Sequence, residues 1–258
     1  MCKQRLHPYR GLLLIILILV TGCQPKSNEL DRNNSASTTV EGSKTSKVNI
    51  PLREEKVKLS NEITAADRIS YYTNLREVAA ASDKIVFGEI IGIEYEIDPT
   101  GMLYTIATIR VEEVLAGDAQ IGEEISFRYG GGYALGKDYL TVCEGSSETK
   151  MIENLRKWSE EELATAYVYQ HMEGEKDAVL GDRSIYCFKK DDKGDFPETY
   201  IRTDYRESEF VQVKDGRFLL LNMPRSAEEI RAFIDGEKQP AEGALWTKEE
   251  VLEKLGLQ

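Results

Sequence analysis

Histidine and cysteine are scarce in this chain of 258 residues, which holds 2 His and 4 Cys. So few imidazole and thiol groups exclude a His-rich metal site, and a zinc site would need more of them than are present. Basic residues are also the minority: 33 Lys and Arg stand against 45 Asp and Glu, and the net charge is −12. Such an acidic chain is a poor partner for nucleic acid. We therefore expect no metal, no other cofactor and no nucleic acid.

A basic head and a short apolar run open the chain. Lys3, Arg5 and Arg10 come first, and residues 12–20 are wholly apolar. The run is about half of the roughly 20 residues that a membrane-spanning helix needs, so a permanent transmembrane segment is disfavoured. This pattern is typical of a secretory signal peptide, which we predict over residues 1–22.

The end of the apolar run carries a more specific signal. Val20-Thr21-Gly22-Cys23 resembles a bacterial lipobox, in which a branched aliphatic, a small residue and Gly precede the Cys that is lipidated. The resemblance implies a bacterial cell-surface lipoprotein that is cleaved before Cys23 and joined to diacylglycerol through its thiol. Two acyl chains such as palmitate anchor a protein stably, whereas one binds only marginally. The implied place is the outer face of the cell membrane, with the membrane as a partner through Cys23.

The segment after the lipobox has the composition of a linker. Residues 23–61 contain no aromatic side chain and are rich in Ser, Thr, Asn, Lys and Glu. Such a segment cannot bury enough apolar surface to offset the entropy of ordering it. We predict a lipid-anchored disordered tether over 23–61 and one folded domain over 62–258.

Periodicity within the domain predicts mostly strands. Residues 85–97 alternate apolar and polar, but the phase slips at Ile90-Ile91 beside Gly92, which indicates a β-bulge. Further strands are expected at 102–115, 125–129, 137–143, 183–189, 200–205, 210–213 and 217–221. Helices are expected from capping patterns and helical spacing at 74–82, 149–172, 226–236 and 247–256.

Together these elements predict a β-rich α+β fold: a small partly closed OB-like barrel with an inserted helical segment and two C-terminal helices. Residues 82–90 (SDKIVFGEI) and 111–117 (VEEVLAG) resemble the barrel segment of uncharacterised exported proteins from Gram-positive bacteria. That segment is itself similar to netrin-like OB domains. Residues 181–188 (GDRSIYCF) resemble a later strand of the same group. The resemblance implies a fold and no function.

Two polar loops come near to known binding motifs. Residues 131–138 nearly match a phosphate-binding loop, but Asp138 stands where that loop needs a hydroxyl for Mg²⁺. No helical pattern follows, so we expect a glycine-rich loop between strands in which Gly takes positive φ. The charged turn 191–195 (DDKGD) lacks the ligand spacing of an EF-hand, and we expect a solvated hairpin tip.

The reactive side chains of the domain are few. Cys143 and Cys187 lie in strand-like stretches, and two alternatives stay open: one disulfide, or two buried free thiols. Alkylation mass spectrometry without reductant distinguishes them. His171 is expected at the end of an acidic helix, where its charge is favourable to the helix dipole.

Two function classes stay open. The first is a noncatalytic binding or interaction module of the cell envelope, whose partner is an envelope protein or a small ligand. The alternative is an extracytoplasmic hydrolase that uses carboxylates or His171, the sole His after cleavage. Protease inhibition, by analogy with netrin-like inhibitors, ranks last because those proteins use a free N-terminal Cys amine, which acylation of Cys23 would block.

Overall fold

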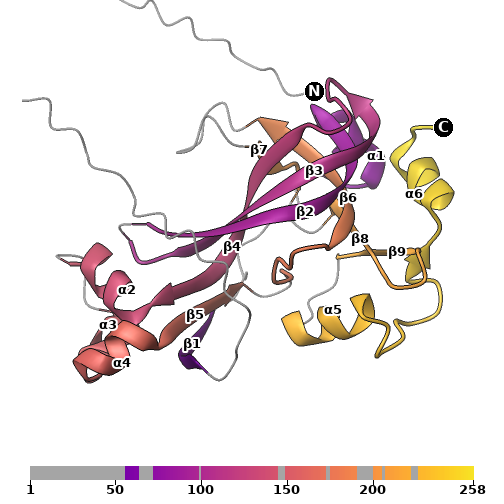
Figure 1. Ribbon diagram of the computed structural model, residues 1–258. Helices are drawn as coiled ribbons and strands as arrows, with labels where there is room; N and C mark the ends of the chain where they lie inside the picture. Colours follow the sequence, from indigo (N-terminus) through magenta and orange to yellow (C-terminus); the bar gives the residue numbers. More distant parts are fainter. Residues whose placement is uncertain are drawn as a thin grey trace, which may run out of the picture. The chain divides into compact units, whose positions relative to one another are not determined.

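The described part of the chain is β-rich: ten strands form one large mixed sheet, and six short helices accompany it (Figure 1). The computed structural model describes residues 56–63, 72–98, 100–144, 149–172, 175–190, 200–204, 207–221 and 226–258, all within the unit Gly42–Gln258. The strands are β1 (Val57–Ile63), β2 (Lys84–Ile97), β3 (Leu103–Gly117), β4 (Glu124–Leu135), β5 (Tyr167–Met172), β6 (Arg183–Lys190), β7 (Tyr200–Arg202), β8 (Glu209–Gln212), β9 (Phe218–Leu220) and β10 (Leu245–Trp246). The helices are α1 (Leu75–Ala80), α2 (Gly136–Val142), α3 (Lys150–Leu155), α4 (Glu160–Thr165), α5 (Ala227–Ile234) and α6 (Lys248–Leu255).

Strands β2 and β3 form a long antiparallel hairpin, as the alternating pattern predicts. The turn between them closes where the amide of Gly101 donates to the carbonyl of Asp98 at 2.9 Å. The register of β2 against β3 shifts between Ile90 and Gly92, which confirms the predicted bulge. A bulge bends its strand and increases the local twist, so it favours a curved sheet over a flat one.

Five strands make a partly ring-like arrangement. Strand β2 pairs with β3 on one side and with β6 on the other, and β3 pairs with β4, all antiparallel. Strand β7 pairs antiparallel with β6 and, at Phe127 and Tyr200, parallel with β4. The series of pairs β4–β3–β2–β6–β7 thereby returns to β4.

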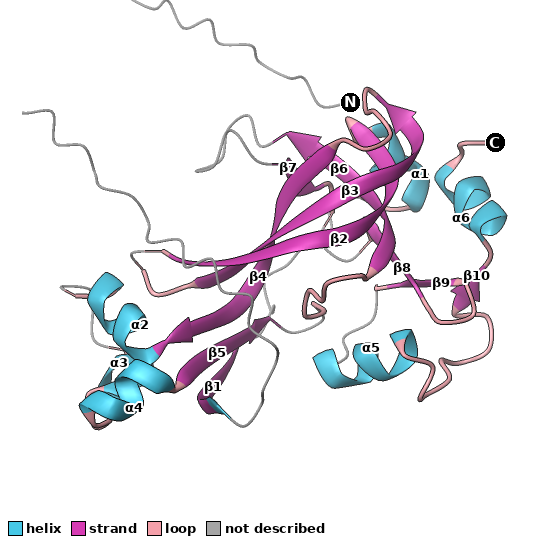
Figure 2. Cartoon of the chain, in the orientation of Figure 1, coloured by secondary structure: helices cyan, strands magenta, loops and turns pink. Residues whose placement is uncertain are grey.

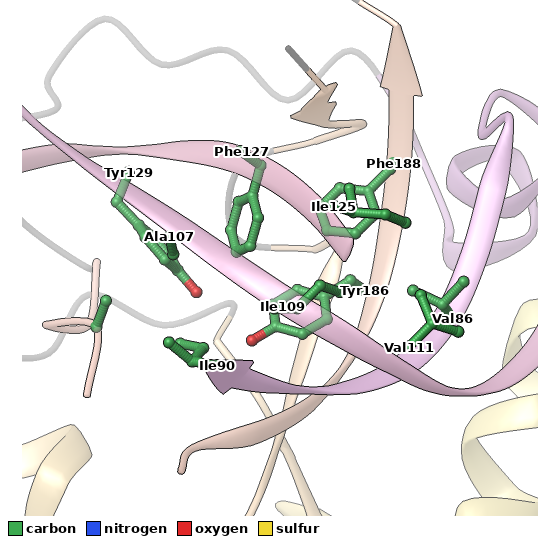
Figure 3. Packing of buried hydrophobic residues seen from close by; sticks show 11 residues of the cluster. Val86, Ile90, Ala107, Ile109, Val111, Ile125, Phe127, Tyr129, Tyr186 and Phe188 are labelled. Atoms are coloured by element: carbon green, nitrogen blue, oxygen red, sulfur yellow. The ribbon is translucent and has the colours of Figure 1, made fainter. Parts of the chain in front are cut away.

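Apolar side chains from four of these strands meet in one cluster (Figure 3). Phe127 lies at its centre, with ring centroids 5.0 Å from Tyr129, 5.1 Å from Tyr186 and 4.9 Å from Phe188. Ala178, from the segment that precedes β6, also belongs to the cluster. Four buried aromatic rings therefore pack together where the strands of the ring face one another.

Strand β4 continues beyond the ring and enters a second group of strands. Its second half, from Gly131, pairs antiparallel with β5, and β5 pairs parallel with β1. Helices α2, α3 and α4 lie together beside this group, away from α1, α5 and α6 (Figure 2). Tyr139 of α2 and Ile152 and Leu155 of α3 lie in one buried apolar cluster with Val168 of β5, and Leu163 of α4 packs against it.

The prediction of a strand at 137–143 is wrong, because these residues form helix α2. Tyr139 and Cys143 lie one helical turn apart and are both buried in the same cluster. The Tyr139 hydroxyl donates to the carbonyl of Gly101 at 2.7 Å, which ties α2 to the β2–β3 turn. Gly101 is distant from Tyr139 in the sequence, so the local sequence pattern gives no sign of this contact.

The prediction of one helical segment over 149–172 is correct in its first part only. Helices α3 and α4 occupy it up to Thr165, and the predicted capping box of Ser159 and Glu162 is present. Ala166 then takes an extended conformation and β5 begins at Tyr167. The side chains of β5 alternate between half-buried and buried, the period of a strand and not of a helix.

The folded region starts earlier than residue 62. Strand β1 begins at Val57 and so takes up the last residues assigned to the tether. Leu59 packs against the cluster of α2, α3 and β5. Because β1 is short and polar on its other face, composition alone reads it as linker.

The predicted C-terminal elements are confirmed. Strands β8 and β9 form the expected antiparallel hairpin, and β10 extends it by one short pair. Ser226 caps α5 by accepting from the amide of Glu229, and Thr247 forms a capping box that begins α6. Asn74 caps α1 in the same way.

Candidate functional site

Four of the sequence-predicted features lie wholly or mostly outside the described residues. They are the signal peptide 1–22, the lipobox with Cys23, the tether up to residue 55 and the charged turn 191–195. The remaining candidates, Cys143, Cys187, His171 and the glycine-rich residues 131–138, can be placed in the fold.

Cys143 and Cys187 are both free and buried in the structure. They belong to different apolar clusters: Cys143 lies beside Tyr139 of α2, and Cys187 lies with Ile185 and Phe210. Burial raises the pKa of both thiols, and that of Cys187 reaches about 12. Because the thiolate is the reactive form of Cys, neither side chain is suited to act as a nucleophile.

The glycine-rich residues 131–138 are not a loop, since strand β4 runs through them and helix α2 follows at once. The expectation that no helix follows is therefore also wrong. Gly131 and Gly132 do take positive φ, at 92° and 148°. A Cβ at Gly131 would stand 2.5 Å from the carbonyl oxygen of Gln170, so glycine here allows β4 to approach β5.

His171 lies in β5 and not at a helix end, so that prediction is wrong. Its ring is stacked with that of Tyr169 at 6.1 Å, and its Nε2 is buried with no hydrogen-bond partner among the described residues. The Tyr169 hydroxyl donates to Asp177 at 2.9 Å. Burial raises the pKa of the Asp177 carboxyl, against the Tyr169 hydrogen bond and the charge of His171, which lower it.

A buried network of charged side chains, which sequence reasoning missed, lies next to the aromatic cluster of the ring. Lys176 contacts Asp182 at 3.1 Å and Glu209 at 3.3 Å. Arg202 pairs with Glu209 at 3.2 Å and with Glu175. The network is charge-balanced and comprises Glu175, Lys176, Asp182, Arg202, Glu209 and the half-buried Arg231.

Hydrogen bonds hold Glu209 at the centre of this network. Its carboxylate accepts from the Tyr129 hydroxyl at 3.0 Å and from the Ser184 hydroxyl at 3.1 Å, in addition to its two cationic partners. The guanidinium of Arg202 lies 4.5 Å from the centroid of the Tyr129 ring. Such pairing and hydrogen bonding are what a buried charge requires.

The ion pairs favour the charged forms of Lys176 and Asp182. Burial alone would lower the pKa of Lys176, but Glu209 and Asp182 raise it above its usual value. Burial alone would raise the pKa of Asp182, but Lys176 and Arg231 lower it. A lysine that holds its proton this firmly is not a base at neutral pH. The ion pairs join β7, β8 and α5 to the segment before β6.

An open hollow lies where the β8–β9 turn meets the end of α5. Its volume is about 250 Å³, and apolar side chains of Val213, Phe233 and Leu245 line it. Lys214 and Gln239 bring polar groups to its lining. A concave surface with an apolar lining and a few polar groups is the usual form of a small-ligand site.

A second hollow at the β3–β4 turn is more polar. It is lined by Lys84, Gln120, Ile121 and Glu123, among others. Lys84 is neutralised there by an ion pair with Glu123. Ile121 is 74% exposed at the tip of the turn. Because Lys84 is already paired with Glu123, this hollow has less charge available for a ligand than the hollow at α5.

The described residues contain no metal-binding cluster and no membrane-spanning helix. No group of three or more His, Cys, Asp or Glu side chains among them could hold a metal ion. None of the helices in the described ranges is both long and apolar enough to cross a membrane.

Comparisons with protein-family profiles, with curated proteins and with solved structures find no match.

Proposed function

We propose that the chain is a lipoprotein held at the outer face of the cell membrane by diacylglycerol on Cys23. The support is the order of a basic head, an apolar run and Val20-Thr21-Gly22-Cys23. Removal of residues 1–22 would make Cys23 the first residue of the mature chain. Acidic domains are repelled by anionic lipid headgroups, so the lipid and not the domain surface would make the membrane contact.

We further propose that the folded region is a noncatalytic binding module of the envelope, with an envelope protein or a small ligand as its partner. One contrast carries this proposal: the two thiols and the Nε2 atom of His171 are buried, while the open hollow at α5 is lined by apolar side chains and by Lys214. Cys187 is a protonated thiol in the core, and His171 presents a buried Nε2. The Cys187 thiol and the Nε2 atom of His171 cannot meet a substrate without rearrangement of the fold, whereas a ligand can enter the open hollow directly.

We propose that the ring of β2, β3, β4, β6 and β7 is a small partly closed barrel of the OB type. The number of strands and the return of the pairing through β7 to β4 support this, because the OB fold is a five-stranded, partly open barrel. The position of α2, α3 and α4 after the third strand of the ring is consistent with an inserted helical segment.

The alternative function, a hydrolase that uses carboxylates or His171, has one observation in its favour. The pKa of Asp177 is raised by burial, and its carboxylate meets the Tyr169 hydroxyl near His171. Raised carboxyl pKa values are typical of general acids. If the purified chain cleaves any ester, peptide or glycoside, and Asp177→Asn or His171→Ala abolishes that cleavage, the noncatalytic proposal is wrong.

The anchor is tested by intact mass spectrometry of the native chain from a bacterial membrane fraction. We expect a mass that lacks residues 1–22 and carries acyl groups on Cys23. Cys23→Ser should abolish acylation and release the chain from the membrane. Cys2→Ser is the matched control, because Cys2 lies in the segment that is removed, and it should change neither property. A native chain that retains residues 1–22 would contradict the proposal.

A further inference from the structure

We infer that the hollow at α5 binds a small apolar group that carries a carboxylate. This inference rests on the proposed binding function and names the ligand class for it.

The lining sets the size and polarity of the body of the ligand. Val213 and Phe233, which are 6% and 4% exposed, form the apolar floor of the open hollow, and Leu245 and Pro240 extend it. The volume of about 250 Å³ lies just below the roughly 300–1,000 Å³ of drug-sized ligand sites. The hollow therefore suits one apolar group of the size of a large side chain.

The charges around the hollow determine which polar group the ligand carries. Asp215 is held by Arg217, whose backbone amide and guanidinium donate to it at 2.7–3.0 Å. Lys238 is paired with Glu229 at 2.6 Å. Lys214 is exposed and forms no ion pair with any described residue. Its ammonium is the charge at this hollow that an anionic group can neutralise.

The backbone fixes where Lys214 stands. Its amide donates to the carbonyl of Ile234 at 3.0 Å, which joins the β8–β9 turn to the end of α5. Gly236 takes φ 74°, and a Cβ there would lie 3.2 Å from Cδ of Lys214. The aliphatic part of Lys214 thus passes over a glycine at the edge of the hollow. A carboxylate can contact the ammonium while its apolar body lies on Val213 and Phe233.

The test uses the full lipidated chain in nanodiscs and three probes of one shape. Cyclohexanecarboxylate, cyclohexylmethanol and cyclohexylmethylamine share a ring and differ in charge. We expect the carboxylate to shift the amide NMR signals of Lys214, Gly236 and Leu245. It should bind roughly two- to fivefold more tightly than the alcohol, because an exposed ion pair contributes modestly. The preference should weaken at high salt.

Two variants make the test specific. Lys214→Gln should remove the preference for the carboxylate and leave binding of the alcohol unchanged. Lys137→Gln is the matched control, since Lys137 is an exposed lysine of α2, and it should change nothing. N-acetylleucine and its amide, added in turn, distinguish the end of a peptide from a free acid. Tighter binding of N-acetylleucine than of cyclohexanecarboxylate would identify a peptide C-terminus as the source.

The outcomes separate this inference from the function beneath it. If the alcohol or the amine binds at the hollow as tightly as the carboxylate, the ligand class is wrong while the binding module stands. If no probe shifts these signals, the inference is wrong, and the binding module is then judged on other ligands. If the probes bind and are also chemically converted, the noncatalytic function itself is overturned.

Discussion

Lys176 shows what a single buried charge requires of its surroundings. Two carboxylates face its ammonium at 3.1 and 3.3 Å, and the pKa of Lys176 is raised in consequence. An unpaired charge in this position would be very costly, and the pairs around Lys176 offset that cost. The partners come from β8 and from the segment before β6, so the charge specifies how these elements meet.

Removing the Lys176 charge should therefore destabilise the fold. We expect Lys176→Met to lower the free energy of unfolding by about 3–5 kcal/mol, because Asp182 and Glu209 stay buried with one cation fewer. Lys137→Met, at an exposed position, should change it by no more than about 0.5 kcal/mol. Urea unfolding of both variants measures the difference. Equal effects at the two positions would show that the ion pairs of Lys176 contribute nothing to stability.

The sequence gives little warning of these residues. The charged run around Glu175 and Lys176 has the composition of a solvated loop, and no periodicity marks its burial. The expectation of His171 at a helix end fails for the same reason, since acids precede and follow it. Burial of such side chains depends on partners such as Arg202 and Glu209, which are distant in sequence. Local pattern does not reveal these pairs.

At the scale of elements, long periodic segments and caps were predictable. Strands β2 and β3, the bulge beside Gly92, and the caps at Ser226 and Thr247 all follow from local sequence. The errors at α2 and β5 arise where a short segment takes its structure from packing. Tyr139 of α2 is hydrogen-bonded to the β2–β3 turn. Tyr169 of β5 is the strand partner of Tyr133 in β4.

Gly131 of β4 makes a prediction at this scale, with Gly181 of the turn before β6 as its control. Gly131 and Gly181 have nearly equal φ, 92° and 88°, but only Gly131 has backbone atoms in the place of a Cβ. We expect Gly181→Ala to cost about 1–2 kcal/mol from backbone strain alone. Gly131→Ala should cost at least twice as much, because β5 must move away from β4. Urea unfolding measures both costs, and similar values would contradict the proposed close approach.

At the scale of the whole molecule, closure of the ring was beyond local prediction. It depends on one parallel pair, Phe127 with Tyr200, between strands far apart in the chain. The alternating segments predict curved strands and a shared core but do not fix which edges meet. The hollow at α5 was missed for the same reason, since Val213, Phe233 and Leu245 come from three separate segments.

The whole molecule should lose stability at alkaline pH. Burial raises the pKa of Tyr129 and Tyr186 above that of an exposed tyrosine, and it raises the pKa of Cys187 to about 12. A group whose pKa is higher in the folded state binds its proton more tightly there. Its stabilising contribution is complete below the unfolded pKa and is lost as pH rises towards the folded one. The unfolded values are about 8.5 for Cys and about 10 for Tyr.

We therefore expect the free energy of unfolding to be steady up to about pH 8 and to fall above about pH 9. Urea unfolding over a pH series measures this. Tyrosinate absorbance from the buried rings should appear together with the loss of circular dichroism. Cys187→Ala should reduce the first part of the decline, because a thiol has a lower unfolded pKa than a tyrosine. The buried thiol of Cys143, whose pKa is also raised, should account for what remains of that part. Tyrosinate that forms in full while the native spectrum persists would contradict the account.

The parallel pairing of β1 with β5 determines how a mechanical load would enter the domain. Force applied to the chain ahead of Val57 reaches β1 before any other described element. A pull along the strand axis strains the ladder to β5 in shear, so its hydrogen bonds share the force instead of opening one after another. Strand β5 passes that force to β4, which extends into the ring. The domain can thus bear tension through its longest continuous strands.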